Sequence, residues 1–541
     1  MMRFLPVNHG ALMVELDDLE QTLALLASLK ARPIPGVEEL VPAARTLLVS
    51  FRPAACTTES LVQEIAGRDV TARAAKDGTL VRIPVHYDGE DIAEVAALMG
   101  IAPEELVRRH TASVYSVAFT GFAPGFAYLT GGDPSFDDTP RRKTPRTRIP
   151  AGAVGLAGSF SGVYPQASPG GWQIIGTTPV AMWDIARAVP ALLQPGFRVQ
   201  FVDIATLPEA ERAQWAAPAA GQAAGTPAAT SNDADRPALE VVAPGLQTLF
   251  QDRGRHGQAG QGVSASGAMD QAALKSANRL VGNPSDVACL ETVNGGLQLR
   301  SRGETVVAVT GANAPLTLTD ATGRRWPVGR YRPLALADGD TLAIGEPQAG
   351  MRCYVAARGG FALAPVLGSC STDTLARVGP PALAAGDVLP LHPVAQGAVV
   401  GAEEVPPADL PQPGAVVELD IVLGPRTDWF TPAAVELLCR QEWTVTPQSN
   451  RVGIRLAGDT PLERAVAREL PSEGTALGAI QVPASGQPVL FLADHPLTGG
   501  YPVIGAVAPH HLDRAGQIPV NARVRFRALG AFAPTTVPTD A

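Results

Sequence analysis

Five basic residues lie within eight positions of this chain, in the segment that begins at Arg141 and ends at Arg148. A guanidinium group presents planar N–H donors that match the oxygens of a carboxylate or a phosphate. We therefore predict that Arg141, Arg146 and Arg148 bind substrate or nucleotide. The competing interpretation is that each arginine forms a salt bridge at a surface or in a turn.

A glycine pair follows the basic segment, within the sequence YPQASPGGWQIIG. Glycine has no Cβ, so the backbone at Gly170 and Gly171 can approach a ligand closely. Backbone N–H groups in such a turn can face developing negative charge, as they do in oxyanion sites. We predict that this pair contributes to the same binding site.

A second polar cluster opens the other half of the chain, where Gln251, Asp252 and Arg255 stand beside glycines in QDRGRHG. Such side chains can hold a carboxylate or another polar ligand through charge-assisted hydrogen bonds. The alternative is a pair of tight turns in which Asp bonds its own backbone. We predict a binding role for all three residues.

Several other residues are candidates for catalysis or binding. Glu473 and Asp494 are predicted as a general base or a magnesium ligand, although single carboxylates in turns are more often solvated. His110 ends a predicted helix and is expected to support the structure, with a role as catalytic base as the alternative. The further binding residues predicted in the second half are Asn450, Arg451, Gln481 and Tyr501.

Missing motifs narrow the chemistry. The chain has no GxxxxGK[ST] phosphate loop, no GxSxG elbow and no HExxH or paired-cysteine spacing. A Walker-type nucleotidase, an α/β-hydrolase and a resident metal centre are therefore disfavoured. A lysine flanked by methionines, as used for biotin attachment, is absent as well. A net charge of −9 argues against a nucleic-acid surface.

Cysteine usage and hydropathy indicate the compartment. The five cysteines are scattered, so we expect free thiols in a reducing environment. No apolar run reaches the length needed to cross a membrane, and acidic residues follow the first methionine too early for a secretory signal. These features predict a cytoplasmic protein.

Short strands and turns must position these side chains, because the 541 residues include 55 glycines and 49 prolines. We expect a mainly β protein with an α+β unit at the N-terminus. The predicted helices are 18–30, 57–66, 92–99, 103–110, 270–280 and 433–440. The predicted strands include 11–16, 45–51, 305–310 and 489–493.

An internal echo links the two halves of the chain. Residues 170–176 read GGWQIIG and residues 499–505 read GGYPVIG, while AGAV at 151–154 and LGAI at 477–480 precede them. Short glycine-rich motifs also agree by chance. We predict related barrels in both halves, with the ligand bound where they meet.

With both halves considered, the chain resembles a specific pair of families. GFAPGFAYL, IPAGAVGLAG and YPQASPGGWQIIG are similar to Kip-type inhibitors, also called allophanate hydrolase subunit 1-like proteins. QDRGRHG, SNRVGIRL, GAIQVP and DHPLTGGYPVIG are similar to the subunit 2-like partner family. The resemblance implies cyclophilin-like β-barrels in both halves. The expected domains are an α+β unit over 1–85, a barrel over 86–207, a flexible Ala/Gly/Pro-rich linker over 208–237 and tandem barrels over 238–541.

The same resemblance implies a function. In that family the halves are usually the B and C subunits of ATP-dependent 5-oxoprolinase, which opens 5-oxoproline to glutamate with a LamB/YcsF-type A subunit. ATP with Mg is then a substrate, and a homo-oligomer is compatible with this expectation. One alternative is a carboxyltransferase that moves a carboxyl group from carboxybiotin to urea or another amide. The other is a regulator that docks on a histidine kinase.

Overall fold

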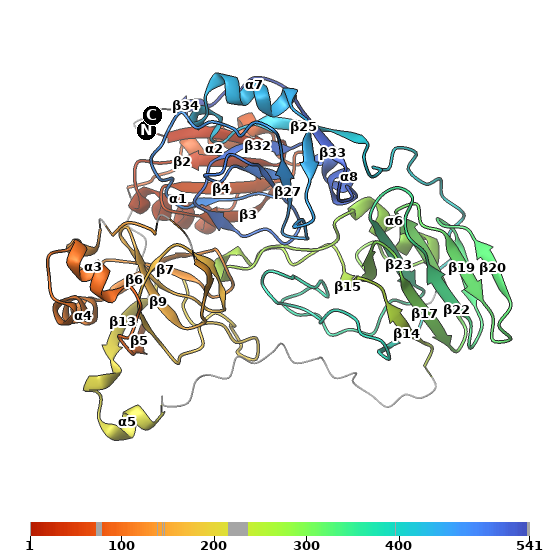
Figure 1. Ribbon diagram of the computed structural model, residues 1–541, viewed down its shortest axis with the longest axis horizontal. Helices are drawn as coiled ribbons and strands as arrows, with labels where there is room; N and C mark the ends of the chain where they lie inside the picture. Colours follow the sequence, from red (N-terminus) through yellow and green to blue (C-terminus); the bar gives the residue numbers. More distant parts are fainter. Residues whose placement is uncertain are drawn as a thin grey trace.

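The computed structural model describes residues 2–71, 78–137, 139–142, 144, 146–214, 236–394 and 397–537. Strands dominate, so the mainly β fold class predicted from the sequence is confirmed. Figure 1 shows four units, with the first and last of them packed together. We call them the N-terminal unit (2–66), the first barrel (80–203), the sandwich (238–391) and the second barrel (416–528).

The N-terminal unit is a sheet with two helices on one face. The helices α1 (Leu19–Ala31) and α2 (Thr58–Ala66) begin at Asp18 and Thr57, whose side chains each accept a backbone N–H. Their apolar residues share one core with the sheet. The strands in sheet order are β3 (Val37–Pro42), β4 (Thr46–Phe51), β2 (Ala11–Glu15), β1 (Met2–Asn8) and β34 (Thr535–Val537).

The last described strand completes this sheet. β34 pairs antiparallel with β1, with Met2 opposite Val537, so both described ends of the chain lie side by side (Figure 1). The opposite face of the sheet packs on the second barrel, where Leu5 and Leu48 share a core with Ala506. A strand and an apolar face therefore join the N-terminal unit to the other half of the chain.

The first barrel has seven strands. β5 pairs parallel with β13, and β5 and β12 meet through a bridge between His86 and Thr177. The helices α3 (Ile92–Leu98) and α4 (Pro103–Ala112) pack on it, because Val95 and Leu106 join its core. The strands in order are β12 (Gln173–Thr177), β9 (Ala153–Ala157), β10 (Phe160–Val163), β7 (Ala127–Thr130), β6 (Tyr115–Thr120), β13 (Arg198–Asp203) and β5 (Leu80–Val85).

A two-stranded ribbon belongs to the same unit. β8 (Arg146–Ile149) pairs with β11 (Ser168–Gly170), and the ribbon positions the end of the basic segment opposite the glycine pair. Because β5 begins at Leu80, the barrel starts before residue 86. Residues 209–214 form α5 (Glu209–Gln214), while residues 215–235 of the predicted linker lie outside the described part of the chain.

The sandwich packs two sheets face to face, since apolar residues of both contribute to one core. The helix α6 (Gln271–Val281) lies on the outer face of the five-stranded sheet. The six-stranded sheet has the order β20 (Arg325–Val328), β19 (Leu316–Thr319), β22 (Thr341–Ile344), β17 (Leu297–Arg302), β14 (Ala238–Pro244) and β24 (Val388–Pro390). The five-stranded sheet has the order β15 (Gln247–Gln251), β16 (Cys289–Val293), β23 (Arg352–Ala357), β18 (Thr305–Gly311) and β21 (Pro333–Leu336).

The second barrel repeats the strand order of the first. The described part of 238–541 therefore consists of a sandwich and one closed barrel, whereas we expected two barrels in tandem. The internal echo falls on equivalent strands of the two barrels, β9 with β29 and β12 with β32, and related barrels in both halves are confirmed. The barrel strands are β25 (Val416–Leu423), β32 (Val503–Val507), β29 (Ala479–Gln481), β30 (Val489–Phe491), β27 (Gly453–Ala457), β26 (Trp443–Val445) and β33 (Arg523–Ala528). Beside it lie α7 (Pro432–Arg440), α8 (Leu512–Gly516) and the ribbon of β28 (Glu473–Gly474) with β31 (Thr498–Gly499).

Each helix and strand predicted from the sequence is present, with ends within about two residues of those expected. Among the described residues, no helix is both long and apolar enough to cross a lipid bilayer. The five cysteines are free thiols, as expected. Short 3-10 turns lie at Pro134–Phe136, Ile204–Thr206, Ala259–Gln261, Thr427–Trp429 and Pro509–His511.

Candidate functional site

One of the predicted binding arginines is paired with a buried carboxylate of the first barrel. Asp91 accepts hydrogen bonds from Arg146 Nη1 at 2.8 Å, from Arg142 Nη1 at 2.7 Å and from the N–H of Ile174 at 2.7 Å. Burial acts to raise the pKa of the Asp91 carboxyl, but Arg146 and the Ile174 N–H bring it below its ordinary value. Arg146 therefore has the structural partner that the competing interpretation expects.

The equivalent place in the second barrel carries the same kind of triad with its charges reversed. Asp91 and Arg426 are equivalent, because each donates its backbone N–H to the corresponding carbonyl of β12 or β32. Arg146 and Glu473 are equivalent, because each stands opposite the first glycine of the repeated pair. An anion between two cations in the first barrel thus corresponds to a cation between two anions in the second.

The third member of the second triad comes from another unit. Arg426 Nε donates to Glu473 Oε1 at 2.8 Å, and Arg426 Nη2 donates to Glu15 Oε1 of β2 at 2.8 Å. Burial raises the pKa of the Glu473 carboxyl, and the guanidinium opposes that shift. In this geometry Glu473, predicted as a base, holds Arg426, and Arg426 joins the second barrel to the N-terminal unit through Glu15.

The remaining groups of the basic segment and the glycine pair lie along the first-barrel ribbon. Arg141 Nη2 donates to Ser472 Oγ of the second barrel at 3.2 Å, so this arginine crosses between the halves. Arg148 is exposed, and no ion pair to it is found among the described residues. A Cβ at Gly170 would lie 2.5 Å from the Tyr164 hydroxyl, so glycine is needed there for packing. Gly171 accepts a backbone N–H through its carbonyl.

His110 lies in the core of the first barrel. Its Nδ1 is 2.7 Å from the Tyr87 hydroxyl, its Nε2 is 3.1 Å from Ser161 Oγ, and its ring stacks on Phe201. Burial lowers the pKa of His110 to about 3, so the ring is neutral at physiological pH. This environment supports the structural role expected for it.

Of three predicted binding residues in the second barrel, one ends strand β29 and two lie in loops. Gln481 Nε2 donates to the Tyr501 carbonyl at 3.2 Å, and the partly exposed Tyr501 ring lies below the guanidinium of Arg464 at 5.7 Å. Asn450 Oδ1 accepts the N–H of Val452 at 2.9 Å, which is the backbone bond typical of a turn asparagine. Asn450 and Tyr501 reach the surface, while Gln481 is buried.

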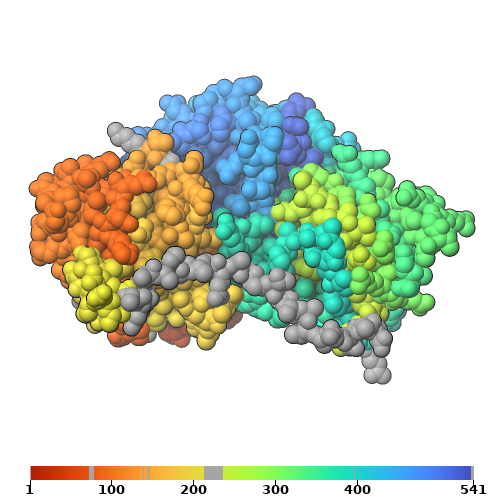
Figure 2. All heavy atoms as spheres, turned by 60° about the horizontal axis from the view of Figure 1, so that its bottom comes forward, coloured from red at the N-terminus to blue at the C-terminus, as the bar shows by residue number. Residues whose placement is uncertain are grey.

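The other predicted residues gather in one buried group, the central polar cluster, between the sandwich and the second barrel. A loop after β23 contributes to it and also reaches the first barrel (Figure 2), where Gln166 Nε2 donates to the Leu375 carbonyl at 3.0 Å. The cluster therefore borders three units. Its members are Gln251, Asp252, Arg255, Ser264, Ser266, Glu291, Ser369, Ser371, Thr372, Asp373, Arg451 and Asp494.

Arg451 and Asp494 form the fully paired part of the cluster. Arg451 Nε and Nη2 donate to the Asp494 carboxylate at 3.0 and 2.9 Å, and Nη1 pairs with Glu291 of β16. Asp494 also accepts from Ser266 Oγ at 2.6 Å and from the N–H and hydroxyl of Thr374 at 2.9 and 2.6 Å. All of its acceptor positions are used, so the geometry gives Asp494 the role of a structural anchor.

Asp252 is similarly bound to the loop after β23. It accepts from Ser369 Oγ at 2.7 Å and from the backbone N–H groups of Cys370 at 2.7 Å and Gly254 at 2.8 Å. The turn interpretation therefore holds for Asp252 in part, since one of its acceptor bonds is local and the others reach across the cluster.

Arg255 and Gln251 differ from their neighbours because polar atoms of both lack partners. Arg255 Nη2 donates to the Ser371 carbonyl, while Nε and Nη1 have no hydrogen-bond partner among the described residues. Gln251 Nε2 donates to the Thr372 carbonyl at 2.8 Å, while its Oε1 has none. Buried polar groups are nearly always hydrogen-bonded, so unpaired ones indicate a water or a ligand.

Asp373 is a candidate that the sequence did not single out from its polar turn. Its carboxylate accepts from Ser264 Oγ at 3.0 Å and from the N–H groups of Leu375 and Ala376 at 3.0 and 2.8 Å. Burial and the nearby Asp494 raise the pKa of Asp373 to about 6, which is in the range of a general acid or base. Only the packing of distant loops creates this environment.

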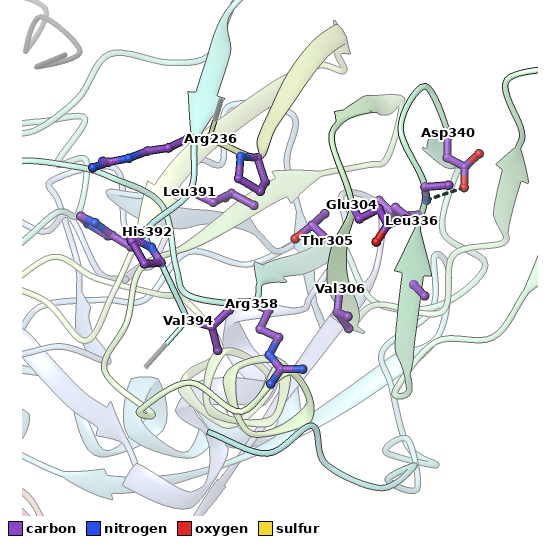
Figure 3. A pocket seen from close by; sticks show the side chains of 14 residues that line it. Arg236, Glu304, Thr305, Val306, Leu336, Asp340, Arg358, Leu391, His392 and Val394 are labelled. Carbon is purple, nitrogen blue, oxygen red and sulfur yellow. Dashed lines mark hydrogen bonds between the residues drawn. The ribbon is translucent and has the colours of Figure 1, made fainter. Parts of the chain in front are cut away.

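Two other places could hold ligands. A cavity of about 720 Å³ lies at the edge of the sandwich (Figure 3), where apolar residues such as Leu336 and Leu391 meet Arg358 and His392. None of the predicted site residues lines it. A possible metal-ligand group, Asp420 with His510 and His511, has its carboxylate engaged by Arg527 Nε at 2.6 Å. The central polar cluster is therefore the candidate site.

Comparison with known families places this geometry in context. Residues 2–193 match the family model "Carboxyltransferase domain, subdomain C and D", and residues 261–528 match "Carboxyltransferase domain, subdomain A and B". The crystal structure of TTHA0988 superposes with a TM-score of 0.80 at 33% identity, covering 96% of this chain and 100% of that one.

Curated relatives from two different subunits cover the two halves of the chain. The C subunit of 5-oxoprolinase from Escherichia coli (strain K12) is 35% identical over 296 residues, which are 53% of this chain and 90% of that protein. The B subunit of 5-oxoprolinase from Bacillus subtilis (strain 168) is 41% identical over 197 residues, 34% of this chain and 81% of that protein. Urea amidolyase of Saccharomyces cerevisiae (strain ATCC 204508 / S288c) is 33% identical over 313 residues, 54% of this chain and 17% of that protein.

Proposed function

The chain belongs to the carboxyltransferase-domain family that contains the B and C subunits of 5-oxoprolinase, and from this premise we propose that it is the fused B–C component of an ATP-dependent 5-oxoprolinase. The supporting observation is that the two relatives, separate chains, match successive parts of one chain whose halves share a core. Fusion fixes a one-to-one ratio of the halves and raises their effective concentration.

The reaction requires activation of a lactam, because amide resonance resists attack by water. Transfer of the γ-phosphoryl group of ATP to the lactam oxygen breaks the bond to ADP and forms a better leaving group. Addition of one water then breaks the C–N bond and opens the ring to an acyl phosphate, and a second water displaces the phosphate and leaves glutamate. ATP and Mg enter as substrates in this scheme.

Residues of this chain can support parts of that scheme. The raised pKa of Asp373 suits it to accept a proton from attacking water. Arg148, exposed beside the glycine pair, is available to a phosphate. Arg141 and Arg146 are engaged by Ser472 and Asp91, so both have structural roles in this scheme. A LamB/YcsF-type protein is the proposed partner, since the curated relatives are named as subunits.

The test is an assay of glutamate formation from 5-oxoproline with ATP, using the chain alone, the LamB/YcsF-type protein alone and both together. We expect turnover that needs ATP and both proteins. Absence of turnover in all three samples would contradict the proposal.

A carboxyltransferase activity is the second candidate, and the description of the matching family models favours it. Carboxybiotin on another chain would then be the donor. Carboxylation of urea or another amide by this chain, dependent on a biotin carboxylase and its carrier, would select this candidate over the first.

A further inference from the structure

We propose that Arg255 and Gln251 form a subsite for a neutral amide group, with Arg255 donating to the amide oxygen and Gln251 Oε1 accepting the amide N–H. The inference rests on the proposed function, because it assigns residues to recognition of the lactam. It also stands on geometry of its own, since the two buried side chains have complementary unpaired atoms and bond successive carbonyls of one loop.

The first support is the combination of burial and missing partners. The Arg255 side chain is among the most deeply buried of the chain, with 1% of the residue exposed, and Gln251 is fully buried. A buried donor or acceptor that is left unpaired has lost its hydrogen bonds to water without replacing them, which destabilises the folded state. One unpaired acceptor beside unpaired donors matches the hydrogen-bonding pattern of an amide.

The second support is that one loop holds both side chains. Arg255 bonds the Ser371 carbonyl and Gln251 bonds the next carbonyl, that of Thr372, so the two residues are fixed at neighbouring positions. Gly379 allows this approach, because a Cβ there would collide with the Ser371 carbonyl and lie 3.2 Å from Arg255 Nη2. The site is therefore built by tertiary packing around the guanidinium.

The third support is charge. Asp252, Asp373 and Asp494 all face Arg255 electrostatically, although none forms an ion pair with it within 4 Å among the described residues. An anionic ligand at Arg255 would meet the repulsion of these carboxylates. A neutral oxygen acceptor avoids that repulsion and still satisfies the donors.

The experiment compares small probes on the full-length chain by ligand-observed NMR titration into the millimolar range. The probes are 2-pyrrolidinone, which has both amide groups, N-methyl-2-pyrrolidinone, which lacks the N–H, and acetate, which is anionic. We expect 2-pyrrolidinone to bind roughly tenfold more tightly than its N-methyl analogue, as one unmade hydrogen bond predicts. Acetate should bind more weakly than either lactam.

Variants assign the effect to residues. Gln251→Met should abolish the preference for the N–H probe, and Arg255→Met should weaken both lactams. Arg253→Met, a substitution of the exposed neighbouring arginine, should leave all three affinities unchanged. Melting curves identify any variant that fails to fold, and the wild-type ranking of the probes remains decisive in that case.

Three outcomes would overturn the subsite: binding of neither lactam, equal affinity for both, or tighter binding of acetate. Each is distinguishable from failure of the proposed function. If the protein hydrolyses 5-oxoproline with ATP but does not prefer 2-pyrrolidinone, the proposed function stands and the proposed subsite is wrong. If the protein prefers 2-pyrrolidinone but does not hydrolyse 5-oxoproline, the proposed subsite stands and the proposed function is wrong.

Discussion

The two barrels have the same strand order but use their equivalent charged positions differently. In the first barrel, Asp91 is satisfied by Arg142 and Arg146 of the same barrel. In the second, Arg426 draws one of its partners, Glu15, from the N-terminal unit. The two barrels thus have a buried charged group at the same position, but its charge is of opposite sign, and only the second barrel pairs it with a residue of another unit.

The largest effect is expected where a second-barrel arginine bridges units. Arg451→Met leaves Asp494 buried without a cation and Glu291 with the more distant Arg352 alone, so the free energy of unfolding should fall by about 3–5 kcal/mol. Urea denaturation at neutral pH measures it. The exposed Arg455→Met serves as the matched control, with a change within about 0.5 kcal/mol. A loss in Arg451→Met no larger than in the control would contradict the bridging role.

A smaller loss of stability is expected in the two triads, and its size should differ between them. Arg426→Met should destabilise by about 3 kcal/mol, because it leaves two carboxylates in the contact between units. Arg146→Met should cost about 1 kcal/mol, because Arg142 still pairs with Asp91 and the site is partly exposed. Parallel urea titrations give both values. Equal losses would show that the N-terminal unit adds nothing to the second triad.

The pH dependence of stability should have opposite signs in the two regions. The pKa of Asp91 in the folded state lies below its ordinary value. Asp91 therefore adds to the free energy of unfolding above its ordinary pKa, and this stabilisation is lost as the pH falls through the folded-state pKa. The pKa of Asp373 in the folded state is raised to about 6. The stabilisation that the protonated Asp373 gives to the folded state is therefore lost as the pH rises from about 4 to 6.

The variant that tests this contrast is Asp373→Asn, which keeps the acceptor for the Leu375 and Ala376 N–H groups. It should remove the fall in stability over that pH interval, amounting to about 1–3 kcal/mol. Unfolding titrations at several pH values measure the slope. An unchanged slope in the variant would assign the titration to another group.

The smallest stability effect is expected at Arg148, which lies exposed on the ribbon of the first barrel. Arg148→Ala should change the free energy of unfolding by less than about 0.5 kcal/mol. In the reconstituted assay we expect a raised KM for ATP with little change in kcat, as for loss of a ground-state contact. An unchanged KM would leave this arginine without a role in binding.

Sequence patterns predicted most of the fold but only part of the candidate site. Periodicity and turn residues located the helices and strands, and a seven-residue echo disclosed the repeated barrel. Arg146 was predicted to bind a ligand and Glu473 to act as a base or magnesium ligand, because their partners, Asp91 and Arg426, are distant in sequence. The unpaired atoms of Arg255 could not be foreseen either, since being unpaired depends on which carbonyls the tertiary fold brings near.

The pairing of β34 with β1 also bears on how such chains can be rearranged. With Met2 opposite Val537, a short peptide could join the two ends while the chain is opened between residues 214 and 236. The rearranged polypeptide would begin with the sandwich and finish with the first barrel, and it would keep the contacts between units that the described residues make. The architecture is therefore compatible with either order of the two halves along the chain.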